Sequence, residues 1–300
     1  MAENKLLLDV LKPYIDQEAN RDKLIAESVL APKSAGYFNL QTGVKGPTTI
    51  NLLTADVVFG DGTECGLGEA SEAKISQRQI VPAVMKVNLP ICEKTLLNTY
   101  AQYQVKLKAG LETLPFEEYL TKIVADKTNA KIEKFIWQGD KEEDEVQFDG
   151  LMKILGAEGS GAVKVEAKST EMATVLAVYN ALPNEAHQDD LVVFAAPSKF
   201  RAWIQELVAA NMYFWNANDK NGEYTIPGTD VKVVALPGLE GTDSYVAGRK
   251  SNFFYGVDIE DAADTVKVIY DEVEEMFYIK MLFNAGVQVA WPNEVVYVGE

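Results

Sequence analysis

The 300-residue sequence predicts an α+β fold built from one long helix, a compact α/β region and a series of long strands. Three observations support this prediction. Apolar residues show helical spacing over 115–138, helix and strand patterns alternate over 170–236, and strand patterns dominate from Ser244 onward. No repeat of fixed period is present, so we do not expect a solenoid or a propeller.

The long helix is predicted by signals at both of its ends and by its apolar stripe. Pro115 suits a first helical turn, where its missing N–H group is not needed. Glu117 and Glu118 complement the positive end of the helix dipole, and Gly139 ends the helix. An acidic loop and a short apolar segment, FDGLMKIL, follow. The stripe contains Phe116, Leu120, Ile123, Val124, Ile132, Phe135 and Ile136, and the opposite face contains Lys122, Lys127, Lys131 and Lys134.

The part of the chain before this helix is predicted to form arms. Residues 1–46 show helical spacing over Lys5–Lys12 and Asp16–Leu30, and prolines and a Gly-rich segment interrupt it. Strand patterns follow in TTINLL, which begins at Thr48, and in VMKVNLPI, which begins at Val84. A long Gly-rich polar segment separates the two, so we expect a β-arm with a flexible tip. Because an isolated two-stranded ribbon is marginal in water, the arm is expected to lie on a neighbouring chain.

The α/β region begins with a helix that Thr170 is predicted to cap. A buried strand over 191–196 precedes a second helix that starts at Pro197, and another strand covers 231–236. The first helix has a stripe of Met172, Val175, Leu176 and Tyr179, and the second has one of Phe200, Trp203, Ile204, Leu207 and Val208. The later strands are SYVAG, FFYGV, TVKVIYD, MFYIKMLFN, GVQVAW and VVYV.

Composition excludes several classes of function. The net charge of -17 and the lack of clustered Lys and Arg argue against broad nucleic-acid binding and against anionic membranes. The N-terminus is too acidic for a secretory signal, and no apolar stretch approaches the roughly 20 residues of a membrane helix. Two cysteines in 300 residues fit a reducing cytoplasm.

Motifs that suggest chemistry are incomplete. The Gly60–Gly68 segment has Cys65 where a dinucleotide loop needs its third glycine. The pattern Ser71-x-x-Lys74 lacks the Lys-Thr-Gly partner of penicillin-binding enzymes. The acidic loop after the long helix lacks the glycine and the glutamate of a calcium loop, so we expect a solvated turn there. The acids over 258–264 are expected to form a solvated turn as well. His187, the only histidine, lies in a polar loop and is expected at the surface. We therefore expect no cofactor, no metal site and no catalytic residue.

One aromatic cluster leaves two alternatives open. Met212–Trp215 contains three aromatic residues in sequence. No Lys or Arg is interleaved with them, so the cluster is a poor platform for stacking nucleic-acid bases. It is either core at the end of the second helix or a subunit contact, since aromatic residues are enriched at interfaces.

The long helix that ends in QGD and leads into FDGLMKIL resembles the spine helix of tailed-bacteriophage major capsid proteins. The closing strands also resemble this family, with a G-x-x-V-x-x-P step at Gly286, Val289 and Pro292, although Asn284-Ala285 stands where the family usually has Arg. The order of segments is similar to the Hong Kong 97-type capsid fold, which encapsulins share. The resemblance implies an N-terminal arm (1–46), an E-loop (47–92), a peripheral domain (93–155 and 250–285) and an axial domain (156–249 and 286–300).

This resemblance implies a non-enzymatic subunit of an icosahedral virion capsid. The subunits would assemble in the bacterial host cytoplasm into pentamers and hexamers, and would enclose double-stranded phage DNA without sequence-specific binding. A separate scaffolding protein, a portal and a maturation protease are the further partners that it implies. The expected interface residues are Gly60, Asp61, Gly62, Lys74, Arg78, Tyr213, Phe214 and Trp215. The alternatives are an encapsulin-like compartment shell and a cytoplasmic carboxylate-based enzyme or ligand-binding protein.

Overall fold

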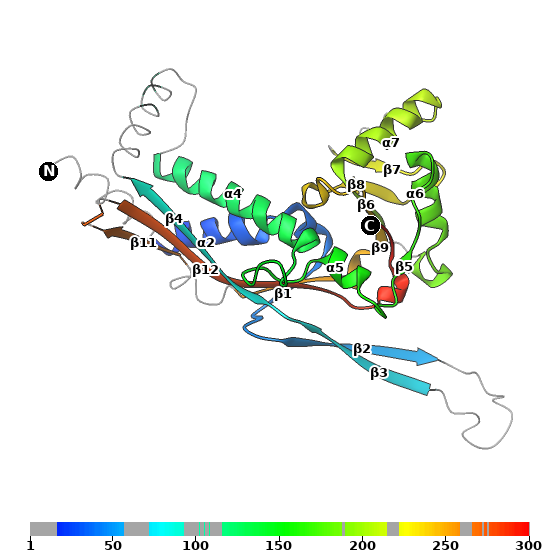
Figure 1. Ribbon diagram of the computed structural model, residues 1–300, viewed down its shortest axis with the longest axis horizontal. Helices are drawn as coiled ribbons and strands as arrows, with labels where there is room; N and C mark the ends of the chain where they lie inside the picture. The colour runs from blue at the N-terminus through cyan, green and yellow to red at the C-terminus, as the bar shows by residue number, and fades with distance from the viewer. Residues whose placement is uncertain are drawn as a thin grey trace.

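The structure is a computed structural model, and it describes residues 17–56, 72–92, 102, 105, 108, 116–187, 190–214, 222–258, 266–271, 273–274 and 276–299. Its described part contains two sheets and a two-stranded ribbon, with helices packed against the sheets (Figure 1). The helices are α2 (Glu18–Ile25), α4 (Phe116–Gln138), α5 (Leu151–Gly156), α6 (Glu171–Asn180) and α7 (Pro197–Ala209), and the shorter turns are η1 (Ala26–Leu30), η2 (Lys33–Tyr37), η3 (Asn184–Ala186), η4 (Pro237–Leu239), η5 (Lys250–Asn252) and η6 (Pro292–Glu294).

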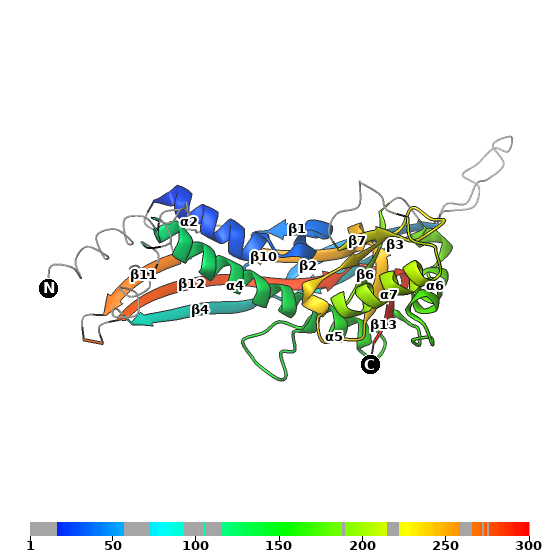
Figure 2. The same ribbon diagram turned by 90° about the horizontal axis from the view of Figure 1, so that it is seen from above.

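The five-stranded sheet is organised around one long strand, β12 (Met276–Val289). Antiparallel β4 (Ala83–Cys92) pairs with one edge of β12. On the other edge β12 pairs first with β11 (Val266–Asp271) and then with β10 (Phe253–Asp258), and β1 (Asn39–Thr42) lies parallel to β10. The helix α4 runs along this sheet in both views (Figures 1 and 2).

Two sequence expectations about these strands are wrong. The segment over 84–91 is a strand, as predicted, but it pairs with β12 in the sheet, and the second strand of the β-arm is formed by residues 72–80, which were predicted to belong to the flexible tip. The segments MFYIKMLFN and GVQVAW form one continuous strand, because Gly286 does not interrupt it. A Cβ atom on Gly286 would lie 3.0 Å from the backbone of Val81 and Pro82. This glycine therefore marks a close approach of two chain segments inside the sheet.

The six-stranded sheet has the order β5-β13-β9-β6-β8-β7. Its central strand β6 is buried at every position, as its apolar sequence predicts. The helices α6 and α7 cover one face through a core that includes Val175, Val178 and Trp203. The remaining strands are β5 (Val163–Lys164), β6 (Leu191–Ala195), β7 (Glu223–Thr225), β8 (Lys232–Ala235), β9 (Tyr245–Arg249) and β13 (Val296–Val298).

The main core joins α4 to both sheets. It contains Ile132 and Trp137 of α4, Phe194 of the six-stranded sheet, and Phe253 and Phe277 of the five-stranded sheet. The predicted limits of the long helix are confirmed from Phe116 to its end before Gly139. Its predicted stripe is only partly right, because Ile123 is exposed while Ala125, Glu133 and Trp137 are buried. The second half of α4 is thus covered on more sides than one apolar stripe indicates.

Two further sequence expectations are confirmed. The Thr170 side chain caps α6 by accepting a 3.2 Å hydrogen bond from the Ala173 N–H group. The helical pattern over Asp16–Leu30 corresponds to α2 and η1, which pack against α4. The helical pattern over Lys5–Lys12 lies outside the described residues.

Candidate assembly surfaces

The ribbon is formed by β2 (Thr48–Asp56) and β3 (Glu72–Ile80), and Figure 1 shows it extending away from the rest of the molecule. Its base is anchored, because Ile50, Leu52 and Ile80 are buried in a small core of their own. Further out, Leu53 and Ile75 lie directly opposite each other in the strand register. Their exposed fractions are 65% and 72%, respectively. The ribbon therefore presents a cross-strand pair of apolar side chains to the outside of the subunit.

The predicted interface residues of this arm are only partly described. Gly60, Asp61 and Gly62 lie outside the described residues. Lys74 belongs to β3, opposite Thr54, and its side chain is not described. The half-buried Arg78 donates a 3.4 Å hydrogen bond from its guanidinium group to the Ser160 carbonyl oxygen.

Arg78 therefore has a contact within its own chain. Burial lowers the pKa of its guanidinium group. This contact ties the base of the ribbon to the segment after α5. A role for Arg78 or Lys74 between subunits stays a prediction.

The aromatic turn after α7 lies at the surface. Phe214 is 73% exposed, and Met212 and Tyr213 are also exposed. The Tyr213 ring stacks on Tyr224 with 4.9 Å between ring centroids, and the Tyr224 hydroxyl accepts a 2.9 Å hydrogen bond from the Phe214 N–H group. For these three residues the core alternative is wrong, and the subunit-contact alternative stays a prediction. Trp215 lies outside the described residues.

A buried carboxylate joins three separate parts of the chain, and sequence reasoning missed it. Glu133 on α4 accepts hydrogen bonds from the Ser34 N–H group at 3.0 Å and the Ser34 hydroxyl at 2.6 Å. It also accepts one from the Gly238 N–H group of η4. The indole N–H group of Trp137 in turn donates to the Ser34 hydroxyl at 2.7 Å. We call Ser34, Glu133, Trp137 and Gly238 the spine junction.

Burial shifts the pKa of the carboxyl group at this junction. Desolvation raises the pKa of the Glu133 carboxyl, and hydrogen bonds from Ser34 and Gly238 together with the charge of Lys33 oppose that shift. The only sequence signal was the spacing of Glu133 and Trp137, which are four residues apart on one helical face. The spacing did not lead to a prediction of burial, because a charged glutamate normally indicates an exposed position.

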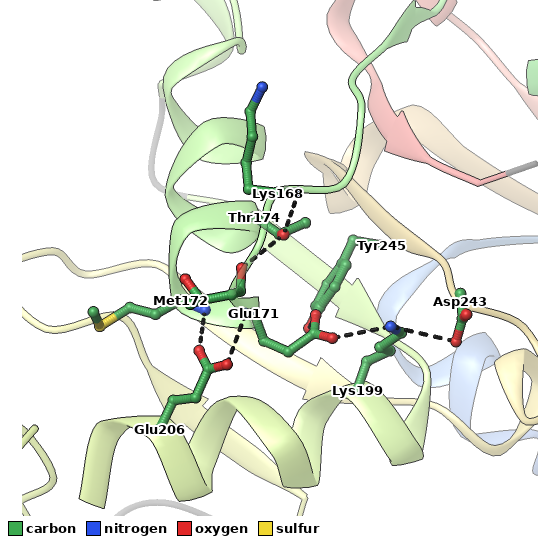
Figure 3. A network of polar contacts seen from close by, with 9 residues as sticks. Lys168, Glu171, Met172, Thr174, Lys199, Glu206, Asp243 and Tyr245 are labelled. Carbon is green, nitrogen blue, oxygen red and sulfur yellow. Dashed lines mark hydrogen bonds and ion pairs between the residues drawn. The ribbon is translucent and has the colours of Figure 1, made fainter. Parts of the chain in front are cut away.

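A second polar network holds α6, α7 and β9 together (Figure 3). The Glu206 carboxylate accepts hydrogen bonds from the N–H groups of Glu171 and Met172 at 3.0 and 2.7 Å, at the N-terminus of α6. The Glu171 carboxylate accepts from Lys199 and from the Tyr245 hydroxyl, each at 2.9 Å. Sequence reasoning named none of these four side chains.

The protonation states of this network fit a structural role. Burial and the hydrogen bond to Glu171 raise the pKa of the Tyr245 hydroxyl. The hydrogen bond to Glu171 also raises the pKa of Lys199. Tyr245 and Lys199 therefore keep their protons and act as hydrogen-bond donors, and neither is activated as a base or a nucleophile.

Three acids of the loop after α4 are paired within the chain by one lysine. Lys153 forms ion pairs with Asp140 at 2.5 Å, Asp149 at 2.9 Å and Glu142 at 3.4 Å. The hydrogen bond from Lys153 lowers the pKa of Asp140. Within the described ranges, no group of three or more His, Cys, Asp or Glu side chains is arranged to hold a metal ion. His187 is exposed and contacts Tyr179 edge to face, with 4.9 Å between ring centroids.

Comparison of the sequence with family models and with curated proteins finds no match. Comparison of the structure finds several. The satellite phage P4 procapsid that includes the size determination (Sid) protein aligns with a TM-score of 0.61 at 10% identity, over 93% of this chain and 90% of that chain. A structure from Gordonia phage Cozz aligns with a TM-score of 0.59 at 13% identity, over 89% of this chain and 85% of that chain.

A third structure, the capsid of an empty GTA particle, aligns with a TM-score of 0.56 at 12% identity, over 91% of this chain and 89% of that chain. Each alignment includes most of both chains. The chain therefore has the Hong Kong 97-type fold of tailed-phage major capsid proteins.

Proposed function

We propose that this chain is the structural subunit of an icosahedral virus capsid that closes into pentamers and hexamers around double-stranded phage DNA. The observation that supports this proposal most directly is the β2–β3 ribbon. It extends from the body of the subunit and exposes Leu53 and Ile75 as a pair. In a monomer both side chains would be exposed to solvent, whereas in a shell they would pack on a neighbouring subunit.

The energetics of such a contact suit a shell. Burying two large aliphatic side chains stabilises a contact by about 1.5–3 kcal/mol each. The two together would make only a modest contribution to one pairwise contact. Because every subunit of a closed shell gives and receives the same contact, the modest contribution is repeated around the particle.

The other partners follow from the same proposal. The net charge of -17 suits a container whose walls do not retain DNA during packaging or release. A separate scaffolding protein, a portal and a maturation protease would act on the shell during its assembly in the host cytoplasm. The predicted peripheral and axial domain boundaries belong to this proposal too. Among the described segments, no helix combines the length and the apolarity that a membrane crossing requires.

The proposal is tested by the size of the assembled protein. Size-exclusion chromatography with light scattering on the full chain, followed by electron microscopy of the leading peak, is expected to show pentamers, hexamers or closed shells. A double variant, Leu53→Asp with Ile75→Asp, should remain a folded subunit and lose assembly. Val208→Asp, at an exposed position of α7, serves as the matched control.

A small oligomer that stays small at high protein concentration and high salt would contradict the proposal and favour an enzyme or ligand-binding protein. Closed shells that contain a cargo protein in place of DNA would favour the compartment shell.

A further inference from the structure

A groove of about 390 Å³ lies between α4 and the strands β4 and β12. Its floor is apolar, because Met85, Ile132 and Phe283 line it and are nearly fully buried. Its rim contains the exposed residues Lys86, Lys127 and Lys131. We call this site the lysine-rimmed groove. It is an unusual feature for a chain in which 45 acids outnumber 28 bases.

The charges around the groove are available for a partner. Among the residues that the structure describes, none of the three lysines forms an ion pair with a carboxylate. One acid, Asp144, also lines the groove. Its carboxylate accepts hydrogen bonds from the Val146 N–H group at 3.1 Å and from the Gln147 side chain at 3.4 Å. The groove is therefore positive at its rim and apolar at its floor.

A segment of opposite character lies at the far end of the same sheet, at the turn between β11 and β12 (Figures 1 and 2). Val273 in this turn is 92% exposed. Four of the five residues over 271–275 are acids. We call Asp271, Val273 and Glu274 the acidic tip.

The acidic tip has a defined shape. The Asp271 carboxylate accepts hydrogen bonds from the N–H groups of Val273 at 2.9 Å and Glu274 at 3.3 Å. The Glu274 carboxylate accepts one from the Tyr278 hydroxyl. These contacts present Val273 outward between negative charges, which matches the apolar floor and the positive rim of the groove.

The strand register excludes contact between the tip and the groove of one chain. The strand residue of the groove nearest to the tip is Asn88 on β4, which pairs with Lys280, four positions beyond Met276, where β12 begins after the tip. At about 3.3 Å per residue, the start of β12 and this end of the groove are separated by roughly 13 Å along a straight strand, which is beyond the reach of the Val273 side chain. Any contact between them is therefore made by two copies of the chain.

We infer that the acidic tip of one copy docks into the lysine-rimmed groove of a second copy, with Val273 against the apolar floor. This inference rests on the proposed function, because it assumes that copies assemble. The contact joins two different surfaces, so it is heterologous and generates rings or extended arrays in place of closed dimers. It is separate from the ribbon contact, because it uses neither β2 nor β3.

The test is disulfide cross-linking in the full chain with Cys65 and Cys92 replaced by serine. The double variant Val273→Cys with Val146→Cys places one thiol on the tip and one at the groove, and docked copies bring the two within disulfide reach. Mild oxidation is expected to give a ladder of covalent oligomers on a non-reducing gel. Each single variant gives no ladder, and Val273→Cys with Val208→Cys is the matched control.

Charge reversal is a second, independent test of the same contact. Lys131→Glu is expected to reduce the ladder at least several-fold, and Glu274→Lys in the same chain is expected to restore it. Shells without a ladder would overturn the docking inference and leave the proposed function intact. A ladder in a small oligomer would support the docking and contradict the shell, and a full chain that stays monomeric would overturn both.

Discussion

The spine junction and the β2–β3 ribbon differ in where their side chains find partners. The junction buries a carboxylate and an indole N–H group, and every polar atom discussed there has a partner within the chain. The ribbon leaves two apolar side chains exposed at its outer part. The polar groups of the junction are therefore satisfied within the fold of the subunit, whereas the apolar pair of the ribbon can be covered only by a surface outside the subunit.

Removal of the indole at the junction is expected to give the largest loss of subunit stability. Trp137 is fully buried and donates its N–H group to Ser34. Trp137→Ala is expected to reduce the free energy of unfolding by about 3–5 kcal/mol, because it leaves a large cavity in the core. Urea unfolding of the unassembled subunit measures this loss. Phe214→Ala, at an exposed aromatic position, is the control and should change the value by less than about 0.5 kcal/mol.

Adding one methyl group to the junction is the next largest change. A Cβ atom on Gly238 would lie 2.2 Å from the Glu133 carbonyl oxygen and 2.4 Å from the Trp137 ring. Gly238→Ala is therefore expected to cost about 1–3 kcal/mol of stability by overpacking. Gly36→Ala, where an added Cβ atom meets nothing within 4 Å, is the matched control in the same unfolding assay. Equal midpoints for the two variants would contradict the packing described for the junction.

The charge of Glu133 makes the junction sensitive to pH. Burial raises the pKa of this carboxyl above its ordinary value of 4.5, so the folded subunit holds the proton more tightly than the unfolded chain. The stabilisation from this group is fully present below that ordinary value and is lost as the pH rises through the raised value.

Glu133→Gln removes this titration. The variant is expected to cost about 1–3 kcal/mol at acidic pH, because an amide oxygen replaces only one of the two acceptor oxygens. The difference from the unsubstituted chain should shrink as the pH rises above 4.5, and urea midpoints across that range measure it. A difference that is constant with pH would show that Glu133 does not titrate differently in the folded subunit.

Substitutions in the ribbon are expected to give the smallest change in subunit stability. Leu53→Ser with Ile75→Ser should change the free energy of unfolding by less than about 0.5 kcal/mol per site, because both side chains are already exposed. The same variant should assemble less completely than the unsubstituted chain in light scattering. Loss of subunit stability with unchanged assembly would mean that the pair packs within its own chain.

Signals that act within a few residues were read correctly from the sequence. The end of α4 before Gly139, the Thr170 cap and the buried strand β6 depend on local backbone geometry and on runs of apolar residues. The order of these segments, together with the resemblance of the spine region, was sufficient to predict the Hong Kong 97-type fold, which the structural comparison confirms.

The tertiary structure decided what each segment contacts. The strand pattern at 84–91 is the same whether its partner is the ribbon or β12, so only the packed sheet could distinguish them. The charge of Glu133 indicated exposure, and its burial depends on Ser34 and Gly238, which are about a hundred residues away on either side. By itself the sequence determined most of the helices and strands, because these follow from local propensity and periodicity. The exceptions are β3, which lies in a segment that was predicted to be a flexible tip, and β12, which was predicted as two strands. Partner choice and burial were decided by contacts between distant residues, which no local pattern encodes.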